Sequence, residues 1–294
     1  MKYVITGSLG NISKPLTQHL VAAGHDVTVV TTKETKKPEI EALGAKAAVG
    51  SVTDVAFLTK TFKGADAVYA MVPPTLEPSD WKGYIGQIGQ NYAEAIQAAG
   101  IKKVVHLSSI GAHLAEGVGP VSGIHRSELA LNKLEGIDIK HLRPGNFYTN
   151  LFANIGMIKG AGIIGANYGE NTSIVFVHPA DIAAVAFEEL TGLSFTGKTV
   201  RYVVSDERTT TEIAKVLGSA IGKTDLPWIN FSDEDALAGA IGAGLPEEIA
   251  KNYIEMGTSI RSGKMFEDYR KNPTAVSKTK LEDFAKEFAV AYNA

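Results

Sequence analysis

The chain has 294 residues and a net charge of −3, with 45% hydrophobic and 21% charged residues, a balance typical of one large or two small globular domains. It contains no cysteine, which excludes disulfides, thiolate nucleophiles and cysteine-based metal sites, and no long basic run that would indicate direct nucleic-acid binding. The N-terminus lacks a signal-peptide pattern and no apolar run reaches about 18 residues, so we expect a cytoplasmic protein without a membrane span.

The first thirty residues predict a strand, a glycine-containing turn, a helix and a second strand. Residues 3–7 form an apolar, β-branched run, and Leu16, Leu20 and Val21 recur at helical spacing until Gly24 ends the helix. Residues 26–30 are again β-branched. This order is typical of the first βαβ unit of a dinucleotide-binding fold.

The turn in this unit carries the spacing Gly7-x-x-Gly10-x-x-Ser13. Gly7 would allow the tight turn, Gly10 would let the backbone approach a pyrophosphate, and Ser13 would let the helix pack on the strand. The helix N-terminus would then be the anion site. The alternative is a turn without a ligand. We predict that the cofactor-binding residues of this turn are Gly7, Ser8, Leu9, Gly10, Asn11 and Ile12.

The second strand ends in two threonines, which a lysine-rich stretch follows. An Asp or Glu here would hold the ribose 2′-hydroxyl of NAD, whereas hydroxyl and ammonium groups suit the 2′-phosphate of NADP. Thr31, Thr32 and Lys33, followed by Lys36 and Lys37, therefore predict NADP(H) as the preferred cofactor, with NAD(H) as the alternative. A solvated loop that carries lysines would give the same sequence.

Strands and helices keep alternating up to about residue 150. Helices are expected at 40–43, 54–62, 84–99 and 122–134, and strands at 45–49, 67–72, 103–109 and 136–144. This pattern predicts an α/β fold, a Rossmann-type doubly wound parallel sheet covered on both faces. Ligands of such sheets lie at the carboxyl ends of the strands. We therefore expect further cofactor contacts after the third and fourth strands, from Ser51, Val52, Met71, Val72 and Pro73.

After residue 148 the alternation loosens, which predicts a smaller, mixed α/β lobe. We expect loops with short strands at 156–169, strands at 174–177 and 198–204, and helices at 182–190, 209–221, 231–256 and 273–293. Thr209 and Glu212 resemble a capping box. The expected domains are a dinucleotide-binding domain at 1–150 and a substrate or partner lobe at 151–294. The two strands of this lobe are candidates to return to the main sheet.

Several stretches share a family likeness: the strand and turn at 4–10, the strand end at 72–74, Leu107-Ser108-Ser109, Leu142-Arg143-Pro144-Gly145-Asn146-Phe147, and His178-Pro179-Ala180-Asp181. Together they resemble the NmrA-like branch of the atypical short-chain dehydrogenase/reductase superfamily, over nearly the whole chain. The resemblance implies an NADP- or NAD-binding Rossmann domain with a smaller C-terminal lobe. Some members resemble quinone reductases, and others bind the dinucleotide without turnover and act as redox-sensing regulators.

The sequence departs from this superfamily at the catalytic pair. Most members use a Tyr with a Lys four residues later, but no Tyr-x-x-x-Lys occurs in this chain. The matching helix carries His125 and Leu129 at the two positions. The superfamily's usual proton relay is therefore not available.

Three residues are candidates for catalysis, each with a structural alternative. Ser109 follows the fifth strand, where its hydroxyl could bond a substrate carbonyl or satisfy a loop amide. His125 offers an imidazole, a side chain that transfers protons in many enzymes, although a His at a helix start is often a cap. Tyr148 could act as the acid if a positive neighbour lowered its pKa, or it could pack between the lobes.

Cofactor-adjacent backbone is expected just before Tyr148, at Pro144, Gly145 and Asn146. Helix capping and the helix dipole explain His178 and Asp181 better than a metal site does, and no metal is expected. The chain has no Gly-x-Ser-x-Gly elbow and no P-loop, so neither a serine hydrolase nor a P-loop nucleotidase is indicated.

Two functions stay open at this point. The first is an NAD(P)H-dependent oxidoreductase that transfers hydride to a quinone or a similar small conjugated carbonyl, whose reduced oxyanion is delocalised and needs little acid assistance. The second is a non-catalytic NADP(H)-binding redox sensor that contacts a regulatory protein partner. Neither nucleic acid nor a membrane is expected as a partner.

Overall fold

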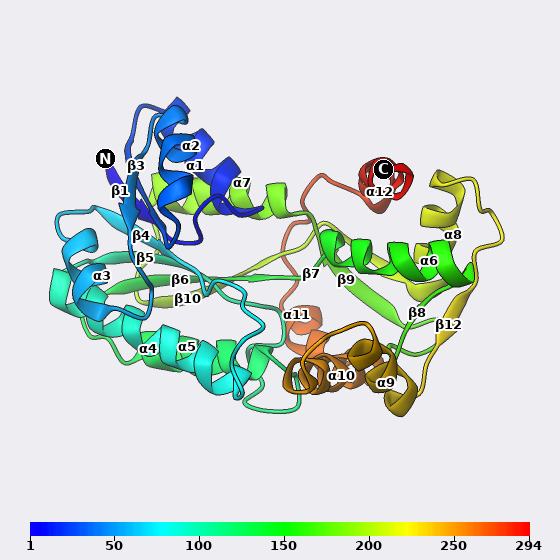
Figure 1. The fold of residues 1–294 in the computed structure, drawn as a ribbon. Helices are drawn as coiled ribbons and strands as arrows, with labels where there is room; N and C mark the ends of the chain where they lie inside the picture. Colours follow the sequence, from blue (N-terminus) through cyan, green and yellow to red (C-terminus); the bar gives the residue numbers. More distant parts are fainter.

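The centre of the molecule is a seven-stranded parallel sheet (Figure 1). The computed structural model describes residues 1–294. The strands lie in the order β10-β6-β5-β4-β1-β2-β3, and every neighbouring pair is parallel. Their bounds are Lys2–Ile5 (β1), Asp26–Thr31 (β2), Lys46–Val49 (β3), Ala67–Ala70 (β4), Lys103–Leu107 (β5), Asp138–Pro144 (β6) and Lys198–Val203 (β10). The predicted Rossmann-type α/β fold is confirmed.

Helices cover both faces of this sheet because its strands are apolar on both faces. Along β1, Tyr3 and Ile5 pack on one side and Val4 packs on the other. Figure 1 shows one helical layer above the strands and another below them. The upper layer consists of α1 (Ser13–Ala22), the short η1 (Glu34–Lys36), α2 (Lys37–Ala42) and α7 (Pro179–Gly192). The lower layer consists of α3 (Val55–Phe62), α4 (Trp81–Ala99) and α5 (Val121–Asn132).

The smaller lobe adjoins the carboxyl ends of the strands and has its own hydrophobic core (Figure 1). It contains a three-stranded sheet of β11 (Asp206–Thr209), β9 (Ser173–Val177) and β7 (Asn146–Phe147), and a pair of β12 (Trp228–Asn230) with β8 (Ile164–Ala166). Its helices are η2 (Tyr148–Asn154), α6 (Ile155–Ala161), α8 (Thr210–Ala220), α9 (Asp233–Gly242), α10 (Glu247–Arg261), η3 (Lys264–Phe266), α11 (Glu267–Lys271) and α12 (Leu281–Asn293). No helix of the protein has the length and apolar character needed to cross a bilayer.

Two elements beyond residue 150 belong to the main sheet. β10 pairs with β6 as an edge strand, and α7 packs on the face that carries α1. β9 does not return, because it lies between β11 and β7 in the small sheet. Of the two strands considered for return, only one therefore joins the main sheet, which draws residues from both expected domains.

Helix starts follow side-chain capping. Asp54 accepts from the Phe57 N–H at 2.9 Å, as its sequence position predicts. Asp80 accepts from the Gly83 N–H at 2.8 Å, so α4 begins at Trp81, one turn before the predicted start. The capping box at the start of α8 is confirmed.

Three expectations for the smaller lobe are wrong in detail, and two short strands were missed. The segment 156–169 contains most of helix α6 as well as β8, and 231–256 is broken into α9 and α10, with Gly244 at φ +92° and Pro246 at the break. The segment 273–280 is not helical, because Pro273 and a Ser/Thr-containing stretch precede α12. β11 and β12 were not expected, since the polar Asp206–Thr209 shows no apolar alternation.

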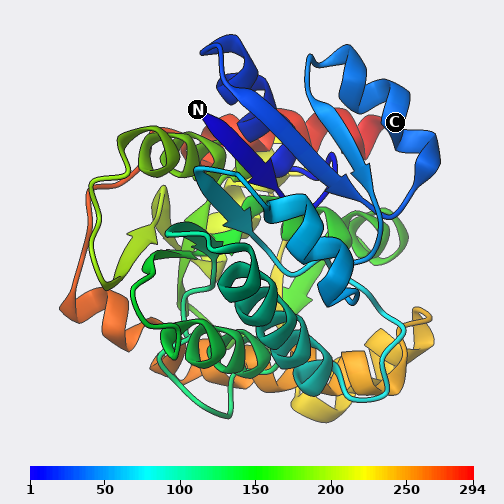
Figure 2. The same cartoon turned by 90° about the vertical axis from the view of Figure 1, so that its left-hand side faces the viewer.

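In Figure 2 the teal and green helices α4 and α5 run side by side beneath the strands. Glycines allow this close approach. A Cβ at Gly89 of α4 would lie 2.4 Å from Cα of Ser127 in α5, and one at Gly123 of α5 would lie 2.7 Å from Cβ of Ile85 in α4. These glycines therefore let α4 and α5 pack closely against each other.

Candidate functional site

Sheet topology places the predicted cofactor residues at the carboxyl ends of the parallel strands. The connections from the neighbouring strands β1 and β4 leave in opposite directions, so the carboxyl ends of these strands form the topological switch point of the sheet. The glycine turn follows β1 and lies beside the segment that follows β4: the Met71 N–H bonds the Thr6 hydroxyl at 2.8 Å. The segments that follow β2, β5 and β6 begin at this same end of the sheet.

The glycine turn has the backbone that its spacing predicts. Gly7 has φ +91°, and a Cβ there would lie 2.6 Å from Oγ of Ser13 and 2.7 Å from Sδ of Met71. Gly10 lies outside the left-handed region, and a Cβ there would meet only the Gly7 carbonyl oxygen, at 3.2 Å. The fold thus requires glycine at position 7, while at position 10 the protein leaves the side-chain space open. An open face at the N-terminus of α1 fits a pyrophosphate.

Hydroxyl groups join the turn to the end of β2. The Ser8 hydroxyl donates to Oγ1 of Thr31 at 3.0 Å, and the Lys33 N–H donates to the same oxygen at 3.3 Å. Thr31 is buried, whereas Thr32 and Lys33 are exposed. A ribose phosphate in this position would meet exposed hydroxyl and ammonium groups before any carboxylate of the strand end.

The ends of β3 and β4 are held by α4. The Asn91 side-chain amide donates to the carbonyl of buried Val52 at 3.3 Å, and the Tyr92 hydroxyl donates to the carbonyl of Met71 at 2.6 Å. Ser51 is half-buried, and its hydroxyl lies 2.7 Å from that of Thr53. Side chains of α4 therefore anchor the backbone of Val52 and Met71 beside the switch point.

The candidate catalytic residues Ser109 and His125 are both bonded to backbone in this structure. The Ser109 hydroxyl donates to the Ile110 carbonyl at 3.0 Å. Nδ1 of His125 lies 2.8 Å from the Ala112 carbonyl oxygen, to which it donates. The imidazole thus stabilises the loop between β5 and α5. Its Nε2 atom has no hydrogen-bond partner within the protein.

The structure does not support Tyr148 as an acid. Its ring is fully buried and stacks between Phe176 and Phe284, with ring centroids 5.1 Å and 5.3 Å away. Burial raises the pKa of the phenol, the opposite of what a proton donor at neutral pH needs. Tyr148 packs against aromatic rings, as the alternative expected, but within the core of the smaller lobe rather than between the lobes.

A buried ionic network under the site was not anticipated. The Arg143 guanidinium donates to both carboxylate oxygens of Glu128, at 3.0 Å and 2.7 Å, and to Asp268 and the Tyr202 hydroxyl, at 3.2 Å each. The Ser108 hydroxyl donates to the same Glu128. Although burial opposes it, the hydrogen bond from Arg143 holds the pKa of Glu128 below its usual range. The sequence signal for this network was an arginine near the carboxyl end of a strand in the middle of the predicted sheet.

Two further polar groups near the site lack partners. Both ring nitrogens of His113, in the loop after β5, are buried without a hydrogen bond, and burial lowers the pKa of this imidazole. The side-chain amide nitrogen of Asn146, just after Pro144 and Gly145, is also buried and unpaired. A donor that the protein leaves unsatisfied at this end of the sheet fits a site that binds a polar cofactor.

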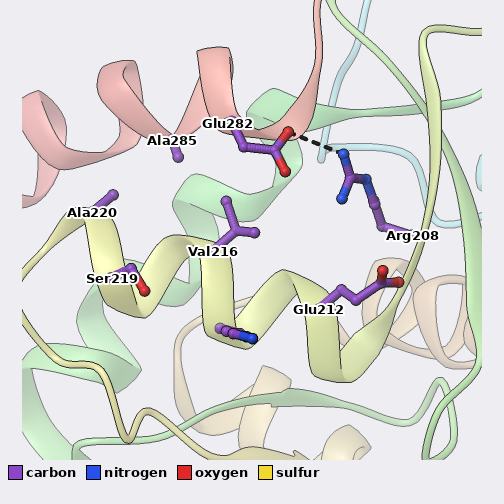
Figure 3. Close-up of a pocket in the computed structure, with 8 residues that line it drawn as sticks. Arg208, Glu212, Val216, Ser219, Ala220, Glu282 and Ala285 are labelled. Carbon is purple, nitrogen blue, oxygen red and sulfur yellow. Dashed lines mark hydrogen bonds and ion pairs between the residues drawn. The ribbon is translucent and has the colours of Figure 1, made fainter.

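A pocket of about 450 Å³ lies elsewhere, between α8 and α12 (Figure 3). Arg208 lines this pocket and donates to Glu282 at 3.0 Å, and it also pairs with Asp206. None of the predicted site residues lines this pocket. The Arg208 guanidinium is thus already paired with two carboxylates.

A family model described as NAD(P)H-binding matches residues 7–191, more than half of the chain. The chain belongs to the NAD(P)H-binding family. The matched range contains every residue predicted to bind cofactor, from Gly7 to Asn146. The resemblance to NmrA-like atypical short-chain dehydrogenase/reductases is confirmed.

Known relatives of this NAD(P)H-binding protein include reductases. It is 24% identical over 266 residues to a (4-alkanoyl-5-oxo-2,5-dihydrofuran-3-yl)methyl phosphate reductase of Streptomyces griseus, covering 88% of this chain and 87% of that protein. It is 24% identical over 253 residues to an NAD(P)H azoreductase of Xenophilus azovorans, covering 86% and 85%. The crystal structure of the NADPH-dependent quinone oxidoreductase QOR2 of Escherichia coli, in complex with NADPH, superposes with a TM-score of 0.83 at 21% identity, covering 97% of this chain and 99% of that chain.

Proposed function

We propose that the protein is an NADPH-dependent reductase of a small conjugated acceptor, a quinone or a similar carbonyl compound. The observation that carries this proposal is the glycine turn at the β1/β4 switch point, with an open face at Gly10 and no carboxylate among Thr31, Thr32 and Lys33. Membership of the NAD(P)H-binding family supports it, as do the names of the quinone and azo reductases among its relatives.

We assign the residues at the sheet edge to successive parts of the cofactor. Gly7 to Ile12 would bind the pyrophosphate, Thr31 to Lys33 the adenosine ribose, and Ser51 and Val52 the adenine side. Met71, Val72 and Pro73 would line the middle of the cofactor, and Pro144, Gly145 and Asn146 its nicotinamide end. When bound, NADPH supplies the hydride, and the protein residues orient the two reactants.

The choice of a conjugated acceptor follows from the acid groups that the chain offers. Without Tyr-x-x-x-Lys, and with Tyr148 buried between two phenylalanines, no phenol is available as a strong general acid. A quinone accepts hydride to give a delocalised oxyanion, which solvent can protonate, as can the Nε2–H group of His125 when the imidazole carries a proton on both ring nitrogens. In this proposal the Ser109 hydroxyl leaves the Ile110 carbonyl and donates to the acceptor oxygen.

A second candidate function is a non-catalytic NADP(H) sensor that contacts a regulatory protein. The observation that favours it is that the hydroxyl of Ser109 and the Nδ1 atom of His125 are both engaged with backbone carbonyls. Such a protein would bind the cofactor and change the surface that contacts its partner, without reducing an acceptor.

NADPH oxidation, measured against a panel of quinones, azo dyes and simple aldehydes, separates the two functions. The reductase proposal expects turnover with quinones or azo dyes and little with unconjugated aldehydes. Tight NADPH binding by calorimetry without turnover on any acceptor would reject the reductase and leave the sensor.

A further inference from the structure

Two lysines from different elements share one carboxylate beside the end of β2. The Nζ atom of Lys14, in the first turn of α1, lies 3.1 Å from Oε1 of Glu39, and Nζ of Lys36 lies 2.8 Å from Oε2. Glu39 belongs to α2, so the bridge joins α1, η1 and α2. The three side chains are between 41% and 43% exposed, which leaves their charged ends accessible to a ligand.

The bridge lies next to the proposed ribose position. The Lys14 N–H donates to the carbonyl of Gly10 in the glycine turn, at 3.0 Å. On the other side, the Lys36 N–H donates to the Lys33 carbonyl at 3.0 Å, and the Lys33 N–H bonds the Thr31 hydroxyl. Lys14 and Lys36 therefore approach one place from the glycine turn and from the end of β2.

Two ammonium groups so placed form a clamp for an oxyanion. Because each contacts an oxygen of the same carboxylate, they are close enough to contact a single phosphate together. A phosphate monoester carries a charge of about −1.5 to −2 and three strong acceptor oxygens, more than a carboxylate offers. A phosphate that arrives here would exchange with Glu39 for the same two ammonium groups.

We propose that Lys14 and Lys36 bind the 2′-phosphate of NADP(H), and that Glu39 sets cofactor specificity by competing with this phosphate for both ammonium groups. The inference rests on the proposed use of NADP(H). It also separates the lysines that follow β2 by role. Lys36 becomes available only when Glu39 is displaced, whereas Lys33 has no ion pair and meets the phosphate directly.

Loss of this competitor strengthens binding of the 2′-phosphorylated cofactor alone. Glu39→Gln removes the charge that holds Lys14 and Lys36, so NADPH affinity should rise about three- to tenfold at low salt, while NADH affinity changes less than twofold. Because more unpaired charge then contacts the phosphate, the affinity for NADPH should also fall more steeply as salt is added.

The decisive experiment is calorimetric titration with adenosine 2′,5′-bisphosphate and with 5′-AMP, which differ only in the 2′-phosphate and involve no reduction. Glu39→Gln should tighten the bisphosphate three- to tenfold and leave AMP unchanged. Glu41→Gln is the matched control, since exposed Glu41 has the same charge and no ion pair. Lys14→Met should weaken the bisphosphate at least fivefold, and exposed Lys60→Met on α3 should not.

Each other outcome decides between the claims. Equal effects of Glu39→Gln and Glu41→Gln, or unchanged bisphosphate binding by Lys14→Met, would overturn the inference. Failure of the unmodified protein to bind either nucleotide would remove the inference together with the cofactor assignment. The expected changes in bisphosphate binding, together with a failure to oxidise NADPH in the presence of any acceptor of the panel, would leave the inference standing and reject only the reductase.

Discussion

Gly7 and Gly10 lie three residues apart in one turn, yet a Cβ would meet different surroundings at each. Position 10 has ordinary backbone angles and only one close neighbour, the Gly7 carbonyl oxygen. A valine there would stand in the space proposed for the pyrophosphate. Gly10→Val should therefore lower NADPH affinity more than tenfold, over about 1.4 kcal/mol, in a folded protein. Titration calorimetry and circular dichroism measure the two properties.

Position 7 provides the contrast for this prediction. Gly7→Ala would force a Cβ against Ser13 and Met71 at a φ of +91°, so it should lower the melting temperature as well as cofactor binding. Unchanged NADPH binding by a folded Gly10→Val protein would show that the turn is structural and that the pyrophosphate lies elsewhere.

The cofactor preference can be tested at the end of β2. A carboxylate at Thr32 would repel a 2′-phosphate and accept from a 2′-hydroxyl, and removal of the Lys33 ammonium would take away an exposed cation. Thr32→Asp with Lys33→Ala should therefore narrow or reverse the preference of NADPH over NADH at low salt. Equal affinity of the unmodified protein for both cofactors would contradict the prediction.

The candidate site was predictable where its chemistry is local in sequence. The spacing of Gly7, Gly10 and Ser13 specifies one turn, and the structure contains that turn. Tyr148 could not be placed in this way, because its stacking partners Phe176 and Phe284 come from distant segments. The assignment of residues to the cofactor stays a prediction, as do the roles of Ser109 and His125.

At the scale of elements, β5, β6 and α5 are joined by a buried chain of neutral imidazoles. Nδ1 of His106 lies 2.9 Å from Nδ1 of His141, so one nitrogen donates and the other accepts. The remaining nitrogens bond Ser127 at 3.2 Å and Asn132 at 3.0 Å. A consistent assignment has Ser127 donating to His106, His106 to His141, and His141 to the Asn132 carbonyl oxygen. An added proton on Nδ1 of His141 would place two N–H groups face to face, and one on Nε2 of His106 would remove the acceptor of the Ser127 hydroxyl.

Acid should therefore destabilise the protein through these two histidines. Burial lowers the pKa of His106 to about 3, with a further lowering by His141, and lowers the pKa of His141 to about 4, where the Glu128 carboxylate partly opposes it. A group whose folded pKa is depressed contributes stability above its unfolded pKa, about 6.5 for His, and loses that contribution as pH falls below it. The free energy of unfolding should decrease from about pH 6.5 downward, by up to about 1.4 kcal/mol per pH unit for each histidine.

Denaturant unfolding at several pH values measures this effect. The double variant His106→Gln with His141→Gln keeps amide hydrogen bonds but removes both titrating groups, so its stability should depend less on pH between about 6.5 and 4.5. Exposed His19→Gln is the control and should retain the dependence of the unmodified protein. An unchanged slope in the double variant would assign the acid sensitivity to other groups.

The elements of the main sheet were largely predictable, and those of the smaller lobe were not. Apolar strands with glycine stops give strong local signals from β1 to β6. The smaller lobe contains short polar strands such as Asp206–Thr209, which pair only because β9 lies beside them. Helix α6, Ile155–Ala161, includes two glycines within seven residues, which lowers its helix propensity, so its sequence favours a loop.

At the scale of the whole molecule, Arg143 connects the two lobes. It lies on β6, and its carboxylate partners lie on α5 beneath the sheet and on α11 of the smaller lobe. Arg143→Met would leave Glu128, which is 5% exposed, as an uncompensated buried charge. We expect a loss of about 3–5 kcal/mol in the free energy of unfolding.

Chemical denaturation of three variants checks this value. Adding Glu128→Gln to Arg143→Met should recover part of the loss, because the stranded charge is gone. Arg126→Met, which breaks an exposed ion pair with Glu116, should have little effect. A loss below about 1 kcal/mol for Arg143→Met would mean that the network contributes little to joining the lobes.

The edge position of β10 has a consequence for biosynthesis. A ribosome releases β6 and Arg143 well before it makes β10, and it makes Asp268 of α11 later still. Until then the nascent sheet ends in an open β6 edge, which can pair with other chains. The guanidinium of Arg143 also lacks one of its carboxylate partners, Asp268, at this stage. The N-terminal half therefore cannot complete its native sheet during translation, and the β6 edge stays open to aggregation until β10 pairs with it.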